Sequence, residues 1–149
     1  MYLDKKKIRE KYKIMSFDTC NNYCNKSHKK TSVIISITSF PKMPRVQKTA
    51  TNNVQDILYL TFADMNYEDS PNGCMQMEDA NKIAEFVNKW YDKVDTIIVN
   101  CDGGVSRSAG VCAAIMRVKE GDDWPVFDNR SKHPNMTCYL RTLKAFHYI

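Results

Sequence analysis

The sequence predicts an α/β fold, in which a small, mainly parallel sheet is flanked by helices on both faces. Four short apolar segments rich in β-branched residues, at 11–17, 31–37, 56–62 and 95–100, are the expected strands. Several of them are nearly continuous rather than alternating, which is typical of strands buried on both faces. Residues 75–93, between the third and fourth segments, carry apolar side chains at helical spacing. This order of strand, helix and strand predicts a parallel crossover unit.

Two further helices are expected after the fourth strand. The stretch "SAGVCAAIMRVKEG" (108–121) predicts a helix that ends at Gly121, and residues 135–148 predict a last helix that starts after Pro134. Trp124 and Pro125, which lie between them, are interpreted as a packing turn. A chain of 149 residues is expected to form one domain, residues 1–149, around a single core.

The charge balance is basic, because 22 Lys and Arg residues exceed 17 Asp and Glu residues for a net charge of +5. This favours anionic ligands only in a general way. The sequence lacks the interleaved aromatic and basic residues of a nucleic-acid surface, which argues against nucleic acid as a partner. The N-terminus opens with charge, and no apolar run approaches the ~18 residues that span a bilayer. We therefore expect a soluble, cytoplasmic protein without membrane association.

Six cysteines occur without a secretion signal, so we expect reduced thiols rather than a disulfide framework. Cys20, Cys24 and His28 are spaced by four residues, but no second cluster with tight ligand spacing accompanies them. We predict no metal site and interpret this stretch as a polar helix or loop with partly buried thiols. Cys112 is expected in the core.

The stretch "CDGGVSRS" (101–108) lies where the fourth strand ends and a helix begins. Ligands of parallel α/β sheets bind at such strand ends, and the free N–H groups and dipole of a helix start attract phosphate-like anions. Gly103 and Gly104 are expected to adopt positive φ and let the backbone approach the anion. The guanidinium of Arg107 should hold two anion oxygens. The predicted phosphate-binding residues are Asp102, Gly103, Gly104, Val105, Ser106 and Arg107.

Cys101 adds a nucleophile to this anion site. A thiol under these amides and the Arg107 guanidinium should have a pKa below its reference value of ~8.5. The implied reaction is attack of the thiolate on phosphorus, followed by hydrolysis of a cysteinyl-phosphate by water. Ser108 can donate to the sulfur and make it a better leaving group. This chemistry requires no metal and no cofactor.

The cysteine, five residues, arginine and serine of "CDGGVSRS" resemble the signature of the protein tyrosine phosphatase superfamily, and "GVSRSAGV" is most similar to its dual-specificity branch. The resemblance implies a phosphatase-type P-loop between a central strand and a helix, and a cysteine-dependent phosphomonoester hydrolase inhibited by phosphate-like oxyanions. The family usually has histidine before the cysteine, where this chain has Asn100. We expect the amide to hydrogen-bond the backbone around the loop but to activate the thiolate less. A catalytically impaired module that binds phosphate or phosphopeptides is the alternative.

The resemblance also implies a general acid on the loop after the third strand, because the leaving oxygen needs a proton. That loop, "ADMNYEDSPNGCM" (63–75), offers Asp64, Glu68 and Asp69. Asp64 is closest to the position of the family's aspartate and is the predicted acid. Asp69 is the second candidate and Glu68 the third.

The substrate is expected to be a phosphorylated protein or peptide. Asp102 is acidic and the loop contains no lysine, whereas superfamily members that act on phosphoinositides tend to carry loop lysines. Phosphotyrosine, phosphoserine or phosphothreonine is therefore the leading prediction, and a phosphoinositide or an RNA 5′ end is the alternative.

Overall fold

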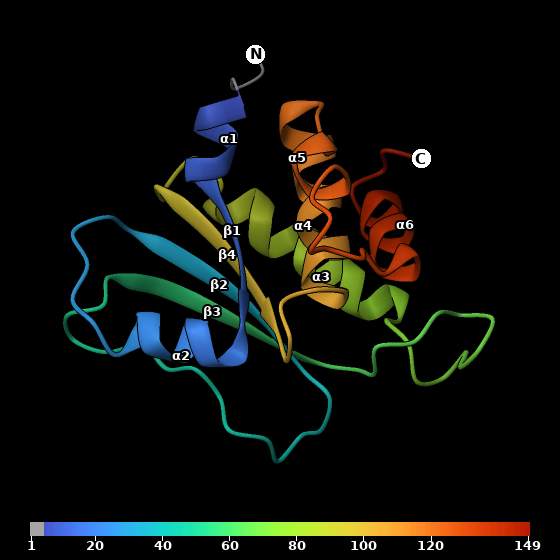
Figure 1. Ribbon diagram of the computed structural model, residues 1–149, viewed down its shortest axis with the longest axis horizontal. Coiled ribbons are helices and arrows are strands. Elements are labelled where there is room, and N and C mark those ends of the chain that lie inside the picture. Colours follow the sequence, from blue (N-terminus) through green and yellow to red (C-terminus); the bar gives the residue numbers. More distant parts are fainter. Residues whose placement is uncertain (1–4) are drawn as a thin grey trace.

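Each strand of the sheet runs parallel to its neighbours in the computed structural model, which describes residues 5–149. The order of the strands is β1-β4-β2-β3 (Figure 1). Their bounds are β1 (Tyr12–Ser16), β2 (Ser32–Thr38), β3 (Val54–Thr61) and β4 (Thr96–Cys101). Because all four strands are parallel, their carboxyl ends meet at one edge of the sheet.

The two central strands, β2 and β4, are buried at every position. Val99 of β4 pairs with Ile14 of β1 on one side and with Ile35 of β2 on the other. Burial on both faces explains why these segments are nearly continuously apolar.

Helices cover both faces of the sheet (Figure 1). The helices are α1 (Lys5–Lys11), α2 (Phe17–Cys24), α3 (Met77–Trp90), α4 (Arg107–Glu120), α5 (Trp124–Phe127) and α6 (Met136–Ala145). Val33 and Ile35 belong to the larger core, with the apolar residues of α3 and α4. Ile34 and Ile98 point to the opposite face, where they pack with Cys20 and Cys24 of α2. The predicted fold class is confirmed.

Two short helices near the N-terminus, α1 and α2, are poorly marked in the sequence. The Ser16 hydroxyl caps α2 by accepting from the N–H of Thr19 at 3.1 Å. Cys20 and Cys24, expected to be partly buried, are 0% and 2% exposed. This added burial follows from the position of α2 against the sheet.

The interpretation of Trp124 and Pro125 as a packing turn is wrong. Both belong to the short helix α5, and Trp124 is 55% exposed. Val126, which is 2% exposed, is the residue of this helix that packs into the core. Proline is accepted at this helix start because its missing N–H would have no partner there.

All six cysteines are free and buried, and Cys112 lies in the core as predicted. No helix between residues 5 and 149 has both the length and the apolar character required to cross a membrane.

Candidate active site

The loop between β4 and α4 lies at the carboxyl edge of the sheet. Cys101 is the last residue of β4 and Arg107 is the first residue of α4, so residues 102–106 form the turn. Gly104 has a φ of +68°, and a Cβ there would lie 2.5 Å from the backbone nitrogen of Ser16. Gly103 has no positive φ, and a Cβ there would meet nothing closer than 4.0 Å. The expectation of positive φ was therefore wrong for Gly103, because Gly104 alone of the two loop glycines adopts the left-handed conformation.

Cys101 is 2% exposed, and its Sγ lies 3.1 Å from Oγ of Ser108. Burial by itself would raise the pKa of Cys101. Hydrogen bonds from the Ser108 hydroxyl and from the N–H groups of Ser108 and Gly104, with the charge of Arg107, outweigh burial and lower this pKa below its ordinary value. The surroundings of the sulfur therefore favour a thiolate.

The guanidinium of Arg107 is held by the protein at two of its three nitrogens. Nη1 donates to Oγ of Ser39 at 3.0 Å and to the carbonyl oxygen of Phe62 at 2.8 Å. Nη2 donates to Oδ2 of Asp102 at 3.1 Å, and the Ser39 hydroxyl donates to the same oxygen at 2.7 Å. The buried Nε has no hydrogen-bond partner within residues 5–149. An anion in the loop can therefore bond Nε–H and the second hydrogen of Nη2 without moving the side chain.

Asp64, the predicted acid, is attached to both the loop between β4 and α4 and the start of α6. Its Oδ1 accepts from the Ser106 hydroxyl at 2.7 Å and from Nδ2 of Asn135 at 3.0 Å. Asn135 also donates to the carbonyl oxygen of Met65 at 3.1 Å. Since both side-chain donors bond Oδ1, the proton of a neutral Asp64 would reside on Oδ2.

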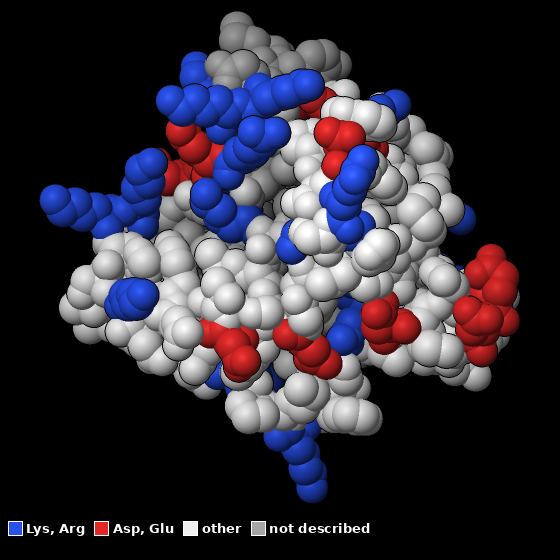
Figure 2. All heavy atoms as spheres, in the orientation of Figure 1, with Lys and Arg blue, Asp and Glu red and all other residues white. Residues whose placement is uncertain are grey.

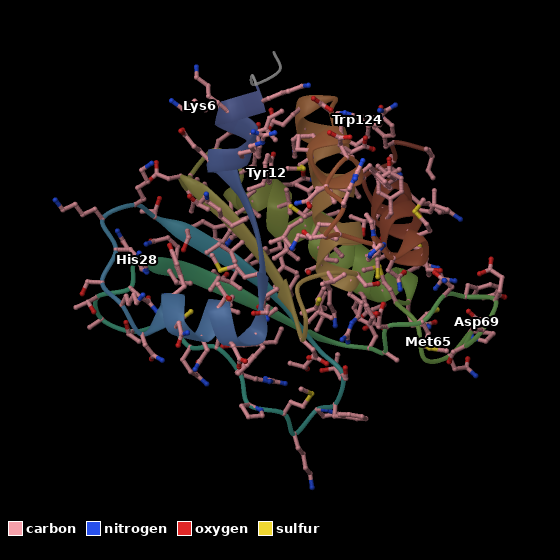
Figure 3. All side chains as sticks on the ribbon, viewed as in Figure 1. Lys6, Tyr12, His28, Met65, Asp69 and Trp124 are labelled. Atoms are coloured by element: carbon pink, nitrogen blue, oxygen red, sulfur yellow. The ribbon has the colours of Figure 1, made fainter. Side chains whose placement is uncertain are left out.

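The other two candidate acids lie further along the same loop. Figure 3 shows Asp69 at the outer end of this loop, beyond Met65. Asp69 and Glu68 are exposed, and among the described residues neither carboxylate forms a hydrogen bond or ion pair with residues 101–107. The structure thus brings only Asp64 to the loop.

The expectation that the Asn100 amide hydrogen-bonds the backbone around the loop was wrong. Its side chain is fully buried, and neither amide atom has a hydrogen-bond partner within the described chain. Side chains alternate along a strand, and Cys101 shares the larger core with Val99 while Ile98 faces α2. The amide of Asn100 therefore points to the α2 face, opposite to the side of Cys101.

Three contributors to the site were not predicted. Ser39 follows β2, so the rule that ligands bind at strand ends would have found it. Asn135, between Pro134 and α6, carries the sequence signature of a helix cap, and its Oδ1 accepts from the N–H of Cys138 at 2.9 Å. Lys132 donates to the carbonyl oxygen of Gly104 at 2.6 Å, and no local sequence pattern marks this contact.

The parallel sheet, with the cysteine and arginine loop after a central strand, has a fold that solved structures share: the chain has the fold of dual-specificity phosphatases. It matches human DUSP28 with a TM-score of 0.64 and 11% identity, over 95% of this chain and 94% of the other. It matches PTPMT1 in complex with PI(5)P with a TM-score of 0.61 and 13% identity, over 95% and 93%.

A mouse putative dual specificity phosphatase complexed with zinc tungstate has a TM-score of 0.55 and 17% identity, over 80% of this chain and 71% of the other. No family model and no curated protein sequence matches the chain. At these identities the similarity establishes a shared fold.

Proposed function

We propose that the chain is a cysteine-dependent phosphomonoester hydrolase. The observation that carries this proposal is the position of the Cys101 sulfur, which lies 3.1 Å from the Ser108 hydroxyl at the start of the turn that ends in Arg107. These neighbours lower the pKa of the thiol. A buried cysteine without such donors has a raised pKa, as Cys112 does at about 12 because of its burial. The contrast between these two thiols supports a nucleophile at position 101.

In the first step the Cys101 thiolate attacks phosphorus and forms an S–P bond while the ester P–O bond breaks. The electron pair of that bond leaves on the ester oxygen, which takes a proton from Asp64. Arg107 and the loop N–H groups stabilise the charge on the three remaining phosphate oxygens. Asp102 and Ser39 hold Arg107 in place during this step.

In the second step water attacks phosphorus, the S–P bond breaks, and its electron pair returns to sulfur. The Asp64 carboxylate takes the proton of the water, and the Ser108 hydroxyl stabilises the departing thiolate by a hydrogen bond. The products are inorganic phosphate and the regenerated thiolate. No metal or cofactor takes part in either step.

The substrate we propose is phosphotyrosine, phosphoserine or phosphothreonine in a protein. Four side chains that are apolar and at least 36% exposed are chain neighbours of residues of the site. They are Phe40 beside Ser39, Met65 beside Asp64, Val105 beside Ser106, and Met136 beside Asn135. We call these four side chains the apolar rim. An apolar rim suits the side chains that flank a phosphorylated residue. Asp102, by contrast, would repel the additional charges of a phosphoinositide or an RNA 5′ end.

The test is turnover of an aryl phosphate by wild type and Cys101→Ser, with tungstate binding measured by calorimetry. We expect the variant to lose turnover and to keep tungstate binding, because the loop and Arg107 remain. Wild-type turnover should also withstand a chelator and be inhibited by tungstate or vanadate. Turnover that persists in Cys101→Ser, or that is lost to a chelator and restored by a divalent ion, contradicts the mechanism.

A second measurement tests the substrate class. Phosphopeptides, phosphoinositides and a 5′-phosphorylated RNA are compared by phosphate release, and we expect the highest kcat/KM for the peptides. Phe40→Ala should lower kcat/KM for a peptide with apolar flanking residues and leave a small aryl phosphate unchanged. An equal effect on both substrates contradicts the role assigned to the rim.

A further inference from the structure

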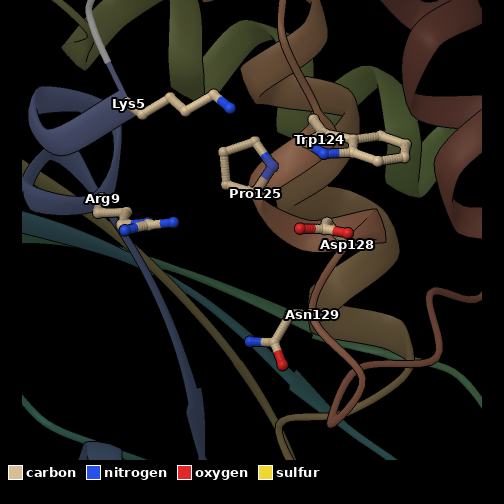
Figure 4. A pocket seen from close by; sticks show the side chains of 6 residues that line it. All are labelled: Lys5, Arg9, Trp124, Pro125, Asp128 and Asn129. Atoms are coloured by element: carbon tan, nitrogen blue, oxygen red, sulfur yellow. The ribbon is translucent and has the colours of Figure 1, made fainter.

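A second surface feature, separate from the phosphate loop, is a hollow beside α1. Its volume is about 290 Å³ and its lining is Lys5, Arg9, Trp124, Pro125, Asp128 and Asn129 (Figure 4). An adjoining hollow of about 200 Å³ shares Arg9, Pro125 and Asn129 with it and extends along β1 to Lys132. We call the two hollows the β1 trough.

The β1 trough is strongly basic. Four cations line it and Asp128 is its one carboxylate. The ion pairs within residues 5–149 are Arg107 with Asp102 and Lys82 with Glu78, so none of the trough cations forms an ion pair with a described carboxylate. The cations are Lys5, Arg9, Lys13 and Lys132. Figure 2 shows basic side chains gathered around α1 and beside a hollow on this face.

One wall of the trough is the free edge of the sheet. β1 pairs only with β4, so its other edge carries N–H and C=O groups without a strand partner. Tyr12, Lys13 and Ile14, three successive residues of β1, line the trough. Successive side chains of a strand point to opposite faces, so three in a row line one hollow only where the backbone edge itself faces it.

The floor of the trough is apolar and its cations lie in a row. Ile14, Met116 and Pro125 contribute apolar surface. Lys5 and Arg9 are one helical turn apart on α1, and Lys13 follows on β1, so the charges are spread along the trough instead of converging on one point. This arrangement fits an extended chain better than a compact polyphosphate.

We infer that the β1 trough docks an extended acidic segment of a partner protein. The segment adds to β1 as a further strand, places apolar side chains on the floor and directs its carboxylates to Lys5, Arg9 and Lys13. Lys132 joins the trough to the phosphate loop through its bond to the Gly104 carbonyl oxygen, so the docked segment lies next to the proposed site of hydrolysis. The inference goes beyond the proposed reaction, and its test measures binding alone.

The test is fluorescence anisotropy with a labelled peptide of about ten residues that alternates Glu and Val. We expect the triple variant Lys5→Glu, Arg9→Glu, Lys13→Glu to weaken binding at least about tenfold at roughly 0.1 M salt. A matched triple, Lys89→Glu, Lys93→Glu, Lys144→Glu, changes the net charge equally but lies outside the trough, and should bind like wild type. All six side chains are exposed, and melting temperatures check that both triples stay folded.

A second probe tests the backbone contribution. The same peptide N-methylated at alternate residues keeps its carboxylates and loses N–H donors, so it should also bind at least about tenfold more weakly. Equal loss in the matched triple, or equal binding of the methylated peptide, overturns the proposal. Binding of inositol hexakisphosphate, anionic vesicles or an oligonucleotide without binding of the peptide also overturns it.

Discussion

The side-chain amide of Asn135 donates to Oδ1 of Asp64 at 3.0 Å, while the carbonyl oxygen of the same side chain accepts from the N–H of Cys138 at 2.9 Å. One residue thus caps α6 and holds the loop that carries the proposed acid. A Cβ at Gly110 of α4 would lie 2.4 Å from the carbonyl oxygen of Asn135, so α4 and the start of α6 are in close contact. The position of Asp64 depends on this packing.

Asn135→Ser should separate the two roles of this side chain. Serine is a good helix cap but is too short to reach Asp64, so the free energy of unfolding should fall by less than about 1 kcal/mol. Turnover of an alkyl phosphate should fall several-fold, because the acid is no longer held, while turnover of an aryl phosphate with an acidic phenol should change little. Asn135→Ala, which also loses the cap, should destabilise the protein by about 1 kcal/mol more. Unchanged alkyl phosphate turnover in the serine variant would mean that Asn135 is only a cap.

Asp64→Asn should impair substrates whose leaving oxygen needs a proton. We expect a loss of about 10²–10⁴-fold on an alkyl or plain phenyl phosphate, with much smaller loss for an acidic phenol. Asp69→Asn is the matched control and should leave turnover of both kinds of substrate unchanged. The same pattern in the Asp69 variant would mean that Asp69, and not Asp64, is the acid.

Ser108→Ala should shift the reactivity of Cys101 to higher pH. The Ser108 hydroxyl is one of the donors that lower the pKa of this thiol, so its removal raises the pKa and a higher pH is needed to form the thiolate. The acid limb of the kcat/KM profile and the pH midpoint of alkylation by iodoacetamide should both move upward. An unchanged alkylation midpoint would show that the backbone N–H groups and Arg107 lower the pKa by themselves.

Asp102→Asn should tighten the binding of oxyanions. The Asp102 carboxylate lies 3.1 Å from Nη2 of Arg107 and competes with a bound anion for the same positive charge. Removing its charge should lower the Kd of tungstate about fivefold or more, measured by calorimetry. Weaker binding in this variant would mean that Asp102 contributes mainly by orienting Arg107.

The two loop glycines should differ in their tolerance of a side chain. Gly104→Ala places a Cβ 2.5 Å from the backbone nitrogen of Ser16 at positive φ, and should lower the free energy of unfolding by about 2 kcal/mol or more. Gly103→Ala meets no atom closer than 4.0 Å and should change it by less than about 1 kcal/mol. Chemical denaturation measures both. Similar stabilities of the two variants would contradict the loop geometry.

Most of the fold could be predicted because its signals are local. Continuous apolar runs mark β2 and β4, and helical spacing marks α3 and α4, where Gly121 ends α4 in the left-handed conformation. α1 was missed, and the stretch that holds the end of α2 was left open as a polar helix or loop, because these helices have seven and eight residues and few apolar side chains. Their burial comes from contacts with the sheet rather than from periodicity.

The sequence by itself determined the sheet type and the order of thiol, turn and arginine, because strand burial, turn chemistry and the helix start are encoded within a few adjacent residues. Only the tertiary structure decided which distant groups complete the site. Asp64 lies 42 residues from its partner Ser106, Ser39 lies 68 residues from its partner Arg107, and Asn135 lies 71 residues from its partner Asp64. These groups meet because parallel strands bring their carboxyl ends to one edge of the sheet, where α6 also begins. The packed sheet also decided where the Asn100 side chain points. Side chains alternate along β4, so the amide of Asn100 lies on the face opposite to Cys101.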